Sequence, residues 1–466
     1  MPFDANSTAL VVIDMQGDFC VKSPDTYLGR IGLSVDNTRE PIEPLQIVLE
    51  ELRKRSFTII HTREGHRPSL SDCPALKVWR SKTGGCELGT KGAGATCSRA
   101  LVRGEASWDI IPELQPVPGE DVVDGCGKGK FVATDLDMIL RQRGVTTLVF
   151  AGVTTSCCVA TTMREATDLG YSCHVLCDCT GDCGAYDYMD TLRMAGERVL
   201  DAQSFLCQVD ASQPGEAARF PRLRRFEPSF AVSANMYDAM AEGGTLDAPS
   251  LRAKLAAEAR AFIGTLQQRA AAEGPKLGAD GHCCSIVACD GGRTNAWPYK
   301  PEAFAPHTTA LLCLDVPDGW QDRADPWVIS LVKLSSACAK AGVDRIGLDS
   351  KSDTGDACSG LSKRPAGAGA FSGTDLDAHL RSRGISNLLI VGWGASTGIN
   401  TTMRQASDRG FDTLIVADCI GAADEADLWG VTACAIRKAI FSACAHSDAV
   451  HTWLERRPGG AVHRSG

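Results

Sequence analysis

The chain has 466 residues, of which 44% are hydrophobic and 23% charged, and a formal net charge of −9. This composition is typical of a globular protein with more than one domain, and no apolar run approaches the roughly 18 residues of a membrane span. The acidic balance argues against a nucleic-acid partner, since the basic cluster Arg222, Arg224 and Arg225 is short. The N-terminal segment MPFDANST has neither the basic nor the apolar part of a signal peptide, so we expect a cytoplasmic protein that binds no membrane.

Short apolar runs alternate with helical patterns in the first half of the chain. The expected strands are Ala9–Ile13, Thr58–His61, Val122–Val123, Thr147–Ala151 and His174–Leu176, and the expected helices are Pro44–Arg55, Thr134–Arg143, Val159–Gly170 and Tyr186–Glu197. Because the strands are continuously apolar, helices are expected to cover both faces of their sheet. The succession therefore predicts a three-layer α/β domain with a mainly parallel sheet.

A long stretch of the first half returns near the C-terminus. Residues 134–182 align with 374–422 without a gap, and about 21 of the 49 positions are identical, whereas the repeats of a solenoid have periods of roughly 20 to 50 residues. Residues 9–14 and 310–315 also resemble each other. The pattern indicates two tandem α/β domains, at 1–212 and 307–458. They are joined by a connector, 213–306, with one expected helix at Ala248–Glu273.

The 21 cysteines are spread over a long chain without a signal peptide, so most are expected to be reduced, buried side chains. Two groups leave zinc binding open as a less favoured alternative. They are Cys173, Cys177, Cys179 and Cys183, and His282, Cys283, Cys284 and Cys289. Neither group has paired CxxC spacing. A redox or metal-buffering protein is the corresponding alternative function.

Three expected strand ends in the first copy carry side chains suited to chemistry. Asp14 follows the first strand, the loop 125–130 with its lysines follows the third, and Cys158 follows the fourth. Ligands of open α/β sheets bind outside the carboxyl ends of the strands, so these groups are expected to meet. Cys158 lies where a helix is expected to begin, and backbone N–H groups and the helix dipole would favour its thiolate. The alternative is an ordinary buried thiol.

Such a set of groups could cleave a carbonyl compound. A carboxylate could take the proton of the thiol and later deliver it to a leaving nitrogen, while backbone N–H groups of the turn at 153–158 stabilise the oxyanion. A nearby ammonium group would lower the pKa of the thiol.

Several motifs of the first copy resemble those of a known family. They are ALVVIDMQGDF, HTREGHRPSLSDCPALK, GEASWDIIPEL, KGKFVATDLDMILRQRGV, AGVTTSCCVATTMREATDLGY and DCTGD, and together they cover nearly all of residues 6–205. In this order they resemble the isochorismatase-like cysteine hydrolases, in particular the branch of biuret and ureidoacrylate amidohydrolases. The resemblance is fainter over 307–455. It implies a six-stranded parallel sheet between helices and a catalytic triad of aspartate, lysine and cysteine.

The resemblance also implies roles for individual residues. Asp14 matches the general base and acid, and Cys158 matches the nucleophile, while Cys157 stands at a position that is usually apolar. A non-proline cis peptide near Val153 and Thr154 would aim backbone N–H groups at the oxyanion.

The lysine of the triad is the departure from the family pattern. In D-K-P-G-K-G-x-F the catalytic lysine stands six residues before the phenylalanine, which here is Phe131, so Gly125 occupies its position. We expect Lys128 to supply the ammonium group instead, with Lys130 as the alternative. Either lysine could also be a solvated loop charge.

The segment after the second strand is expected to shape the pocket. Arg63, Glu64 and His66 could bind the N–H and C=O groups of a substrate, or they could form structural ion pairs. The Asp-x-His metal signature of the nicotinamidase branch is not evident. We therefore expect neither a metal nor a cofactor.

The second copy keeps Asp315 but has Gly398 at the position of the nucleophile and Pro365 at that of the lysine. It is expected to be degenerate and to form an intramolecular pseudo-dimer with the first copy, and a further homo-oligomer is left open. The sequence thus predicts a cysteine-dependent amidohydrolase that cleaves a C–N bond of a small amide or ureido substrate through a thioester. The alternative is an impaired pseudoenzyme that serves as a scaffold for a metabolite or a partner.

Overall fold

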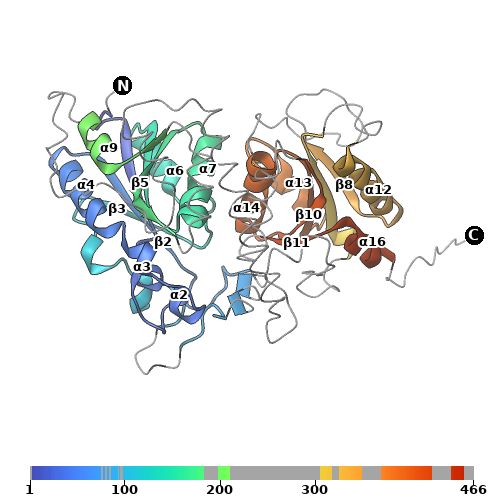
Figure 1. The fold of residues 1–466 in the computed structure, drawn as a ribbon, viewed down its shortest axis with the longest axis horizontal. Coiled ribbons are helices and arrows are strands. Elements are labelled where there is room, and N and C mark those ends of the chain that lie inside the picture. Colours follow the sequence, from blue (N-terminus) through green and yellow to red (C-terminus); the bar gives the residue numbers. More distant parts are fainter. Residues whose placement is uncertain are drawn as a thin grey trace, which may run out of the picture. The chain divides into compact units, whose positions relative to one another are not determined.

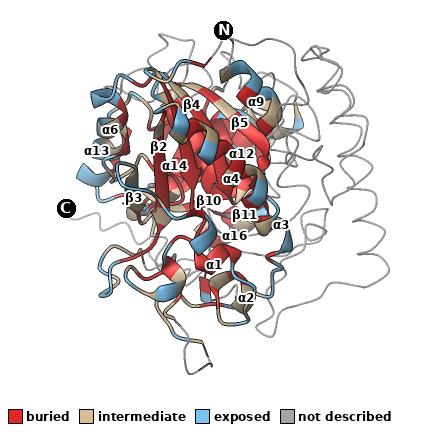
Figure 2. Ribbon diagram, turned by 90° about the vertical axis from the view of Figure 1, so that its left-hand side faces the viewer, coloured by how far each residue is buried: buried red, intermediate tan, exposed pale blue. Residues whose placement is uncertain are grey.

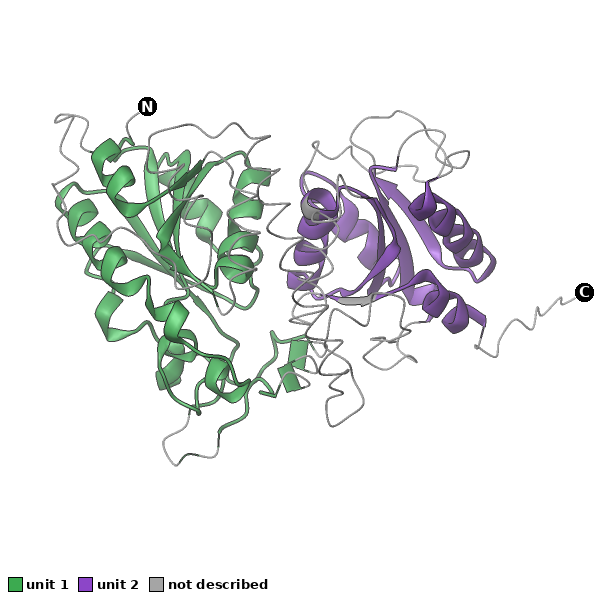
Figure 3. Cartoon of the chain, viewed as in Figure 1, with its two compact units in different colours: residues 1–255 green, residues 256–466 purple. Residues whose placement is uncertain are grey.

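A computed structural model describes residues 3–74, 77–78, 81–82, 85–92, 94, 98–182, 198–209, 305–316, 325–348, 369–421 and 442–455. The chain divides into two compact units, Met1–Leu255 and Ala256–Gly466 (Figure 3). The expected helices at 186–197 and 248–273 lie outside the described residues, as does the expected connector apart from Ala305 and Pro306. The domain limits 1–212 and 307–458 therefore stay a prediction.

The first unit contains a six-stranded sheet in the order β3-β2-β1-β4-β5-β6. All of its strand pairs are parallel. The strands are β1 Thr8–Ile13, β2 Thr58–Glu64, β3 Asp121–Gly125, β4 Thr147–Val153, β5 Ser172–Gly181 and β6 Val199–Leu200. The α/β class and the parallel sheet expected from the sequence are confirmed.

Helices cover both faces of this sheet, as the continuous apolarity of the strands predicts. Helices α4 (Ile42–Lys54) and α9 (Ala202–Val209) lie on one face, and α6 (Leu136–Gln142) and α7 (Ala160–Asp168) on the other (Figure 1). Every residue of β1 is buried. Figure 2 shows the ribbon around β4 and β5 mostly in the red of buried residues, whereas pale blue, exposed residues lie on the helices and loops. The shorter elements are α1 Gly17–Cys20, α2 Tyr27–Arg30, α3 Asp36–Arg39, and the 3-10 turns Ala106–Trp108 and Pro112–Leu114.

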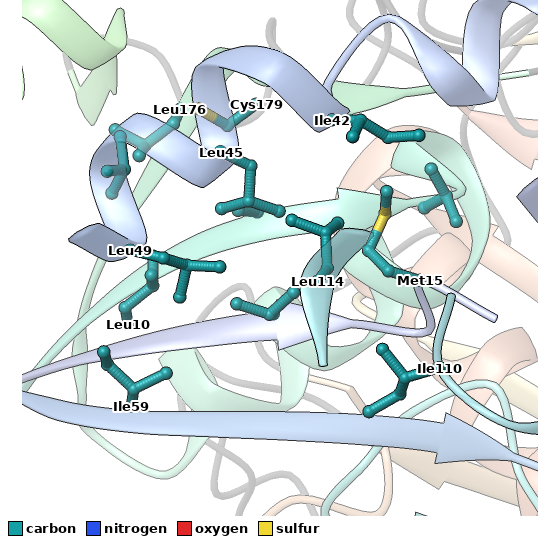
Figure 4. Close-up of a cluster of buried hydrophobic side chains, with 14 of the residues drawn as sticks. Leu10, Met15, Ile42, Leu45, Leu49, Ile59, Ile110, Leu114, Leu176 and Cys179 are labelled. Carbon is teal, nitrogen blue, oxygen red and sulfur yellow. The ribbon is translucent and has the colours of Figure 1, made fainter. Parts of the chain in front are cut away.

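Helix α4 shows how the core forms. Its buried residues Leu45, Leu49 and Leu52 recur at helical spacing and pack with Leu10 of β1 in one cluster (Figure 4). Cys179 belongs to the same cluster, and its thiol forms no disulfide. The expectation that Cys173, Cys177 and Cys179 are buried hydrophobic side chains is confirmed.

The second unit repeats the plan with a five-stranded parallel sheet in the order β11-β10-β9-β7-β8. Its strands are β7 Thr309–Leu314, β8 Asp344–Leu348, β9 Asn387–Trp393, β10 Asp412–Gly421 and β11 Ala443–Ala445. Its helices are α12 Pro326–Lys340, α13 Leu376–Ser382, α14 Asn400–Asp408 and α16 Ser447–Glu455, with a 3-10 turn at Pro306–Thr308. Starting from β8, the strands β8, β7, β9, β10 and β11 correspond in order to β2, β1, β4, β5 and β6 of the first unit. The duplication is therefore visible in the fold as well as in the sequence. No helix in the described ranges of either unit is long and apolar enough to cross a bilayer.

One glycine in each unit lies against the backbone of the neighbouring central strand. Gly152 has a φ of 105°, and a Cβ built on it would lie 2.1 Å from the carbonyl oxygen of Ile13. Gly392 has a φ of 126°, and a Cβ built on it would lie 2.0 Å from the carbonyl oxygen of Leu314. Only glycine fits both the backbone conformation and the contact.

We expect Gly152→Ala to destabilise the first unit by about 3 kcal/mol, because it adds overpacking against a backbone atom to an unfavourable φ. Gly392→Ala should do the same to the second unit only. Gly170→Ala is the control, since Gly170 has a φ of 90° but nothing within 4 Å of its Cβ position, and should cost only about 1 to 2 kcal/mol. Calorimetry on the full chain checks this, and equal losses for Gly152 and Gly170 would contradict it.

Candidate active site

Asp14 stands at the end of β1 with a φ of 48°, a left-handed conformation that aspartate tolerates better than most residues. The side chain is fully buried. Its Oδ1 accepts a hydrogen bond from Thr62 Oγ1 at 2.7 Å, and its Oδ2 lies 2.8 Å from Lys130 Nζ. Burial raises the pKa of Asp14, and the charges of Lys130 and Glu64 respectively lower and raise it, with a net increase.

Lys130 supplies the ammonium group that contacts Asp14. The side chain is fully buried, and Nζ also donates to the carbonyl oxygen of Gly127 at 3.2 Å. Burial alone would lower the pKa of Lys130, but the charges of Asp14, Cys158 and Glu64 and the hydrogen bond with Asp14 together outweigh burial and hold the pKa above its ordinary value. Lys130 is therefore a charged partner of Asp14 rather than a solvated loop charge.

Gly125, which has no side chain, lies next to the Lys130 side chain. A Cβ built on Gly125 would lie 3.7 Å from Lys130 Cδ and 3.3 Å from Thr134 Cγ2. The Lys130 side chain therefore passes over the α-carbon of the residue that replaces the family lysine. The ammonium group reaches Asp14 from five positions further along the chain.

Lys128, which the sequence favours as the replacement, has a different partner. Its Nζ lies 2.8 and 2.9 Å from the two carboxylate oxygens of Glu64. A charge on Cys158 would raise the pKa of both Lys128 and Lys130, so both ammonium groups are within electrostatic reach of the sulfur. The contact with Asp14 distinguishes Lys130.

Cys158 lies in a π-helical turn, Thr155–Val159, that leads into α7. The sequence places the nucleophile just before a helix starting at Val159, whereas the helical turn already begins three residues before the cysteine. Cys158 Sγ lies 3.6 Å from Glu64 Oε2. The ligand atoms of Asp14, Glu64 and Cys158 lie within 4.8 Å of one another, and all three residues are buried.

The expected thiolate is not the favoured resting state. A hydrogen bond with Cys157 raises the pKa of the Cys158 thiol well above its ordinary value, and burial and the charges of Cys157, Asp14 and Glu64 add to this. The expectation of a thiolate considered only the helix terminus, whereas the hydrogen bond with Cys157, burial and the charges of Asp14 and Glu64 all favour the thiol. Cys158 rests as a thiol.

Glu64, at the end of β2, is the second carboxylate of the site. Lys77 Nζ lies 2.8 Å from its Oε1 and donates to the carbonyl oxygen of Cys126 at 2.5 Å. Burial would raise the pKa of Glu64, but the charges of Lys128, Lys77 and Lys130 outweigh it and hold the pKa far below its usual range. Sequence reasoning missed Lys77 as a site residue, although it ends the HTREGHRPSLSDCPALK motif.

The other two residues expected to bind substrate have different surroundings. The Arg63 guanidinium forms ion pairs with Asp124 at 2.8 Å and Asp109 at 2.9 Å and stacks 3.8 Å above the ring of Trp108. Two carboxylates and an aromatic ring thus hold the Arg63 side chain, and its role in substrate binding stays a prediction. His66 is fully buried with Nδ1 3.4 Å from Asp72 Oδ1, and burial and Lys77 lower its pKa to about 3. Its imidazole is neutral at neutral pH.

The turn after β4 has the backbone form that the resemblance implies. The peptide between Val153 and Thr154 is cis. The N–H of Ser156 donates to Asp182 Oδ2 at 2.5 Å, and those of Cys157 and Val159 donate to the carbonyl oxygen of Thr154 at 3.0 and 3.2 Å. An oxyanion role for the backbone at Val153 and Thr154 stays a prediction.

Asp14, Glu64 and Cys158 form the one group of potential metal ligands that the described residues bring together. Their fit to a metal is poor. Lys130 is paired with Asp14, and Lys77 and Lys128 are paired with Glu64. Three ammonium groups already exceed the charge of two carboxylates, and a divalent ion among them would be repelled.

The second unit keeps the backbone conformation of the site but not the thiol or the lysine. Asp315 has a φ of 47°, like Asp14, but Gly398 stands at the position of Cys158 and Ala370 at that of Lys130. The contacts around the loop are nevertheless repeated. Phe131 N donates to Glu165 Oε2 at 3.2 Å, and Phe371 N donates to Gln405 Oε1 at 3.3 Å. The second unit thus retains the contacts that hold the loop and lacks the reactive groups.

The first unit thus combines a parallel α/β sheet with a thiol, a carboxylate and an ammonium group beyond its strand ends, which are groups that a hydrolase can use. The chain belongs to the isochorismatase family, a family of hydrolases: the isochorismatase domain model matches residues 8–204 and 358–445. Both copies of the repeat therefore carry the family signature.

Two of the curated relatives are ureidoacrylate amidohydrolases named RutB. The protein of Caulobacter segnis is 31% identical over 195 residues, which are 40% of this chain and 76% of the relative. That of Caulobacter vibrioides is 30% identical over 195 residues, 40% of this chain and 81% of the relative.

Solved structures that the chain matches include a cysteine hydrolase from Pseudomonas syringae pv. phaseolicola. It has a TM-score of 0.39 and 22% identity, covering 46% of this chain and 97% of that one. An N-carbamoylsarcosine amidase from Thermoplasma acidophilum has a TM-score of 0.33 and 23% identity, covering 42% and 96%.

Proposed function

We propose that the first unit is a cysteine-dependent amidohydrolase that cleaves a C–N bond of a small amide or ureido compound through a thioester on Cys158. The observation that carries the proposal is the buried ion pair of Lys130 and Asp14, 2.8 Å long, in the immediate surroundings of the Cys158 thiol. The similarity to relatives named ureidoacrylate amidohydrolases supports the reaction class.

The protons can be followed through both halves of the reaction. Cys158 gives its proton to Asp14 as the sulfur attacks the carbonyl carbon and forms the C–S bond. Asp14 then passes this proton to the nitrogen as the C–N bond breaks, and ammonia or an amine leaves. A water molecule gives its proton to Asp14 while its oxygen attacks the thioester, and Asp14 returns the proton to the sulfur as the C–S bond breaks.

Transfer of the thiol proton to Asp14 leaves the net charge of the site unchanged. The three ammonium groups and two carboxylates sum to +1 with a neutral thiol, and the sum stays +1 when a thiolate and a protonated Asp14 replace the thiol and the Asp14 carboxylate. Because Asp14 has a raised pKa, it can take the thiol proton more readily than an ordinary carboxylate can. Lys130 stabilises the negative charge of either group.

Trapping of the acyl-enzyme tests the proposal. Biuret, ureidoacrylate and nicotinamide are each mixed with the full chain, ammonia is quantified, and acid-quenched protein is examined by mass spectrometry. We expect ammonia release and an acyl adduct on Cys158 with at least one ureido substrate. The matched variant Cys157→Ala should still form the adduct, whereas Cys158→Ala should not.

The alternative function is a catalytically impaired scaffold that binds a metabolite or a partner. It is favoured by Gly125 at the family lysine position and by the loss of the thiol and ammonium in the second unit. Ammonia release that is equal in wild type and Cys158→Ala for every substrate would exclude the hydrolase. For the second unit we propose a non-catalytic role as an intramolecular companion of the first.

A further inference from the structure

Two carboxylates flank the thiol, and their electrostatic states are opposite. The pKa of Asp14 is raised by burial, so this group can exchange protons during the reaction. The pKa of Glu64 is held far below its usual range by Lys128 and Lys77, so this group stays an anion. The proposed hydrolysis uses Asp14 alone, and it leaves a permanently charged carboxylate oxygen 3.6 Å from the reacting sulfur without a role.

We propose that Glu64 is the residue that selects ureido substrates, by accepting a hydrogen bond from the nitrogen that stays on the carbonyl carbon when the C–N bond breaks. This proposal rests on the proposed function of the first unit. It assigns one carboxylate to each nitrogen of a urea group, with Asp14 at the leaving nitrogen and Glu64 at the retained one.

The position of Glu64 Oε2 carries the argument. A carbonyl carbon about to be attacked lies roughly 3 to 3.5 Å from the nucleophile. With Oε2 at 3.6 Å from the same sulfur, a substituent on that carbon comes within hydrogen-bond reach of Glu64. The leaving nitrogen must face Asp14, from which it takes its proton, so the substituent that faces Glu64 is the retained one.

Lys77 and Lys128 hold the Glu64 carboxylate in a position where it can accept a hydrogen bond from substrate. Lys128 contacts both oxygens of Glu64, and Lys77 contacts Oε1 and the backbone of Cys126. Oε1 thus has two ammonium partners, whereas Oε2 is shared by Lys128 and the thiol. Once the thiol proton has moved to Asp14, the thiol no longer donates to Oε2, and a substrate N–H can take its place. Glu64 and Lys128 then present an acceptor and a donor side by side, which matches the N–H and C=O groups of a ureido substrate.

A hydrocarbon amide places carbon where the retained nitrogen would be. Its C–H groups would desolvate the Glu64 carboxylate without replacing the hydrogen bond, and sites built around such a bond reject analogues that lack it by factors of about 10⁴ to 10⁵. Intrinsic reactivity cannot produce the same preference, because a urea carbonyl is less electrophilic than that of an alkyl amide.

Biuret and malonamide form a matched pair of substrates for the test, because they differ only in NH against CH2 between the two carbonyl groups. With wild type we expect kcat/KM for biuret to exceed that for malonamide by about 10³ or more. Glu64→Gln keeps an uncharged acceptor and should lower this ratio by about tenfold, while Glu64→Leu should lower it by about 10² or more. Glu51→Gln, an ion-pairing glutamate on the outer side of α4, is the matched control and should leave the ratio unchanged.

The ratio of kcat/KM for biuret to that for malonamide distinguishes a role of Glu64 in substrate selection from a purely structural role. If Glu64 only holds the loops together, its variants slow both substrates equally and the ratio stays constant, which overturns the proposal. Biuret methylated on its central nitrogen gives a check on the wild-type protein alone, because it should fall to the level of malonamide; turnover equal to that of biuret would also overturn the proposal. Failure of the proposed function has a different signature, since wild type would then release ammonia from none of these compounds.

Discussion

In a Lys130→Met variant, kcat for ammonia release is expected to fall about 10³-fold at neutral pH. Burial already raises the pKa of Asp14, and the Lys130 ammonium is the largest influence that lowers it. Without that charge the pKa of Asp14 should rise further, so a smaller fraction of Asp14 would be ionised and able to accept the proton of the Cys158 thiol. Initial rates with the best ureido substrate, measured from pH 5 to 9, check this, and part of the rate should return at high pH.

Two other lysines serve for comparison. Lys128→Met should raise KM more than it lowers kcat, because Lys128 is paired with Glu64 rather than with Asp14. Lys54→Met, a change on the exposed side of α4, should alter neither constant. A large loss of kcat in Lys128→Met together with a normal kcat in Lys130→Met would return the ammonium role to Lys128 and refute the catalytic role of Lys130.

A lysine at position 125 in place of Lys130 tests whether an ammonium group beside Asp14 is what the reaction needs, because activity should be regained. Adding Gly125→Lys to a Lys130→Ala variant should recover about tenfold or more of the lost rate, since a short, buried ammonium–carboxylate contact can form from either position. Removal of Lys130 eliminates one of the two neighbours that a Cβ at position 125 would meet, and only the Thr134 methyl at 3.3 Å has to give way. The Gly125→Lys change alone, with Lys130 present, should give no gain.

The fold was largely accessible from the sequence because its signals are local and repeated. Continuous apolarity in residues 9–13 and 147–151 predicts strands buried on both faces, and these are the central strands β1 and β4. The same signals recur in the second copy at 310–314 and 387–393. Placing Asp14 and Cys158 beyond the ends of these neighbouring strands needed only the rule that parallel strands end at one edge.

The lysine could not be assigned in the same way. In the glycine-rich loop 125–130 the direction of each side chain depends on backbone angles that the sequence leaves open, and Lys128 and Lys130 differ in partner rather than in local pattern. The partners are Glu64 and Asp14, more than 60 residues away along the chain. The state of the Cys158 thiol was missed for a related reason, because it depends on how closely Asp14, Glu64 and Cys157 surround the sulfur.

Duplication lets one unit act as a control for the other. Glu165 and Gln405 hold equivalent loops by the same backbone hydrogen bond, so this contact does not require the reactive groups. Asp178 accepts hydrogen bonds from the N–H of Ala202 in the first unit, as Asp418 does from Ser447 in the second. Features shared by the two units thus belong to the scaffold, and the thiol and the Lys130 ammonium are found in the first unit only.

For Asp14→Asn we expect a loss of about 10³ to 10⁴ in kcat/KM, because asparagine cannot carry the proton between sulfur and nitrogen. The matched variant is Asp315→Asn, since Asp315 ends the equivalent strand with the same backbone conformation in the unit without a thiol. Asp315→Asn should leave the rate unchanged. Equal effects of the two changes on the rate would mean that Asp14 serves the fold and not the reaction.

The pH dependence of the wild type provides an independent check of Asp14. Activity needs the ionised carboxylate, and the pKa of Asp14 is raised above its ordinary value of 3.8, so kcat/KM should rise with pH in a range that lies above 3.8. Stability should change in the opposite sense. Below pH 3.8 the folded and unfolded chains both hold this proton; as the pH rises toward the folded-state pKa only the unfolded chain releases it, which favours unfolding.

Folding stability therefore falls between pH 3.8 and the folded-state pKa of Asp14, and activity rises as the pH passes through that folded-state pKa. In Asp14→Asn both this rise in kcat/KM and this loss of stability with pH should disappear together, as measured by initial rates and by denaturant unfolding of the same samples. The proton transfer would be assigned to another group if kcat/KM of the wild type rose with a midpoint at or below pH 3.8. The same would follow if this rise of kcat/KM with pH persisted in Asp14→Asn. Glu64 could not take that role at ordinary pH, since its lowered pKa makes it too weak a base.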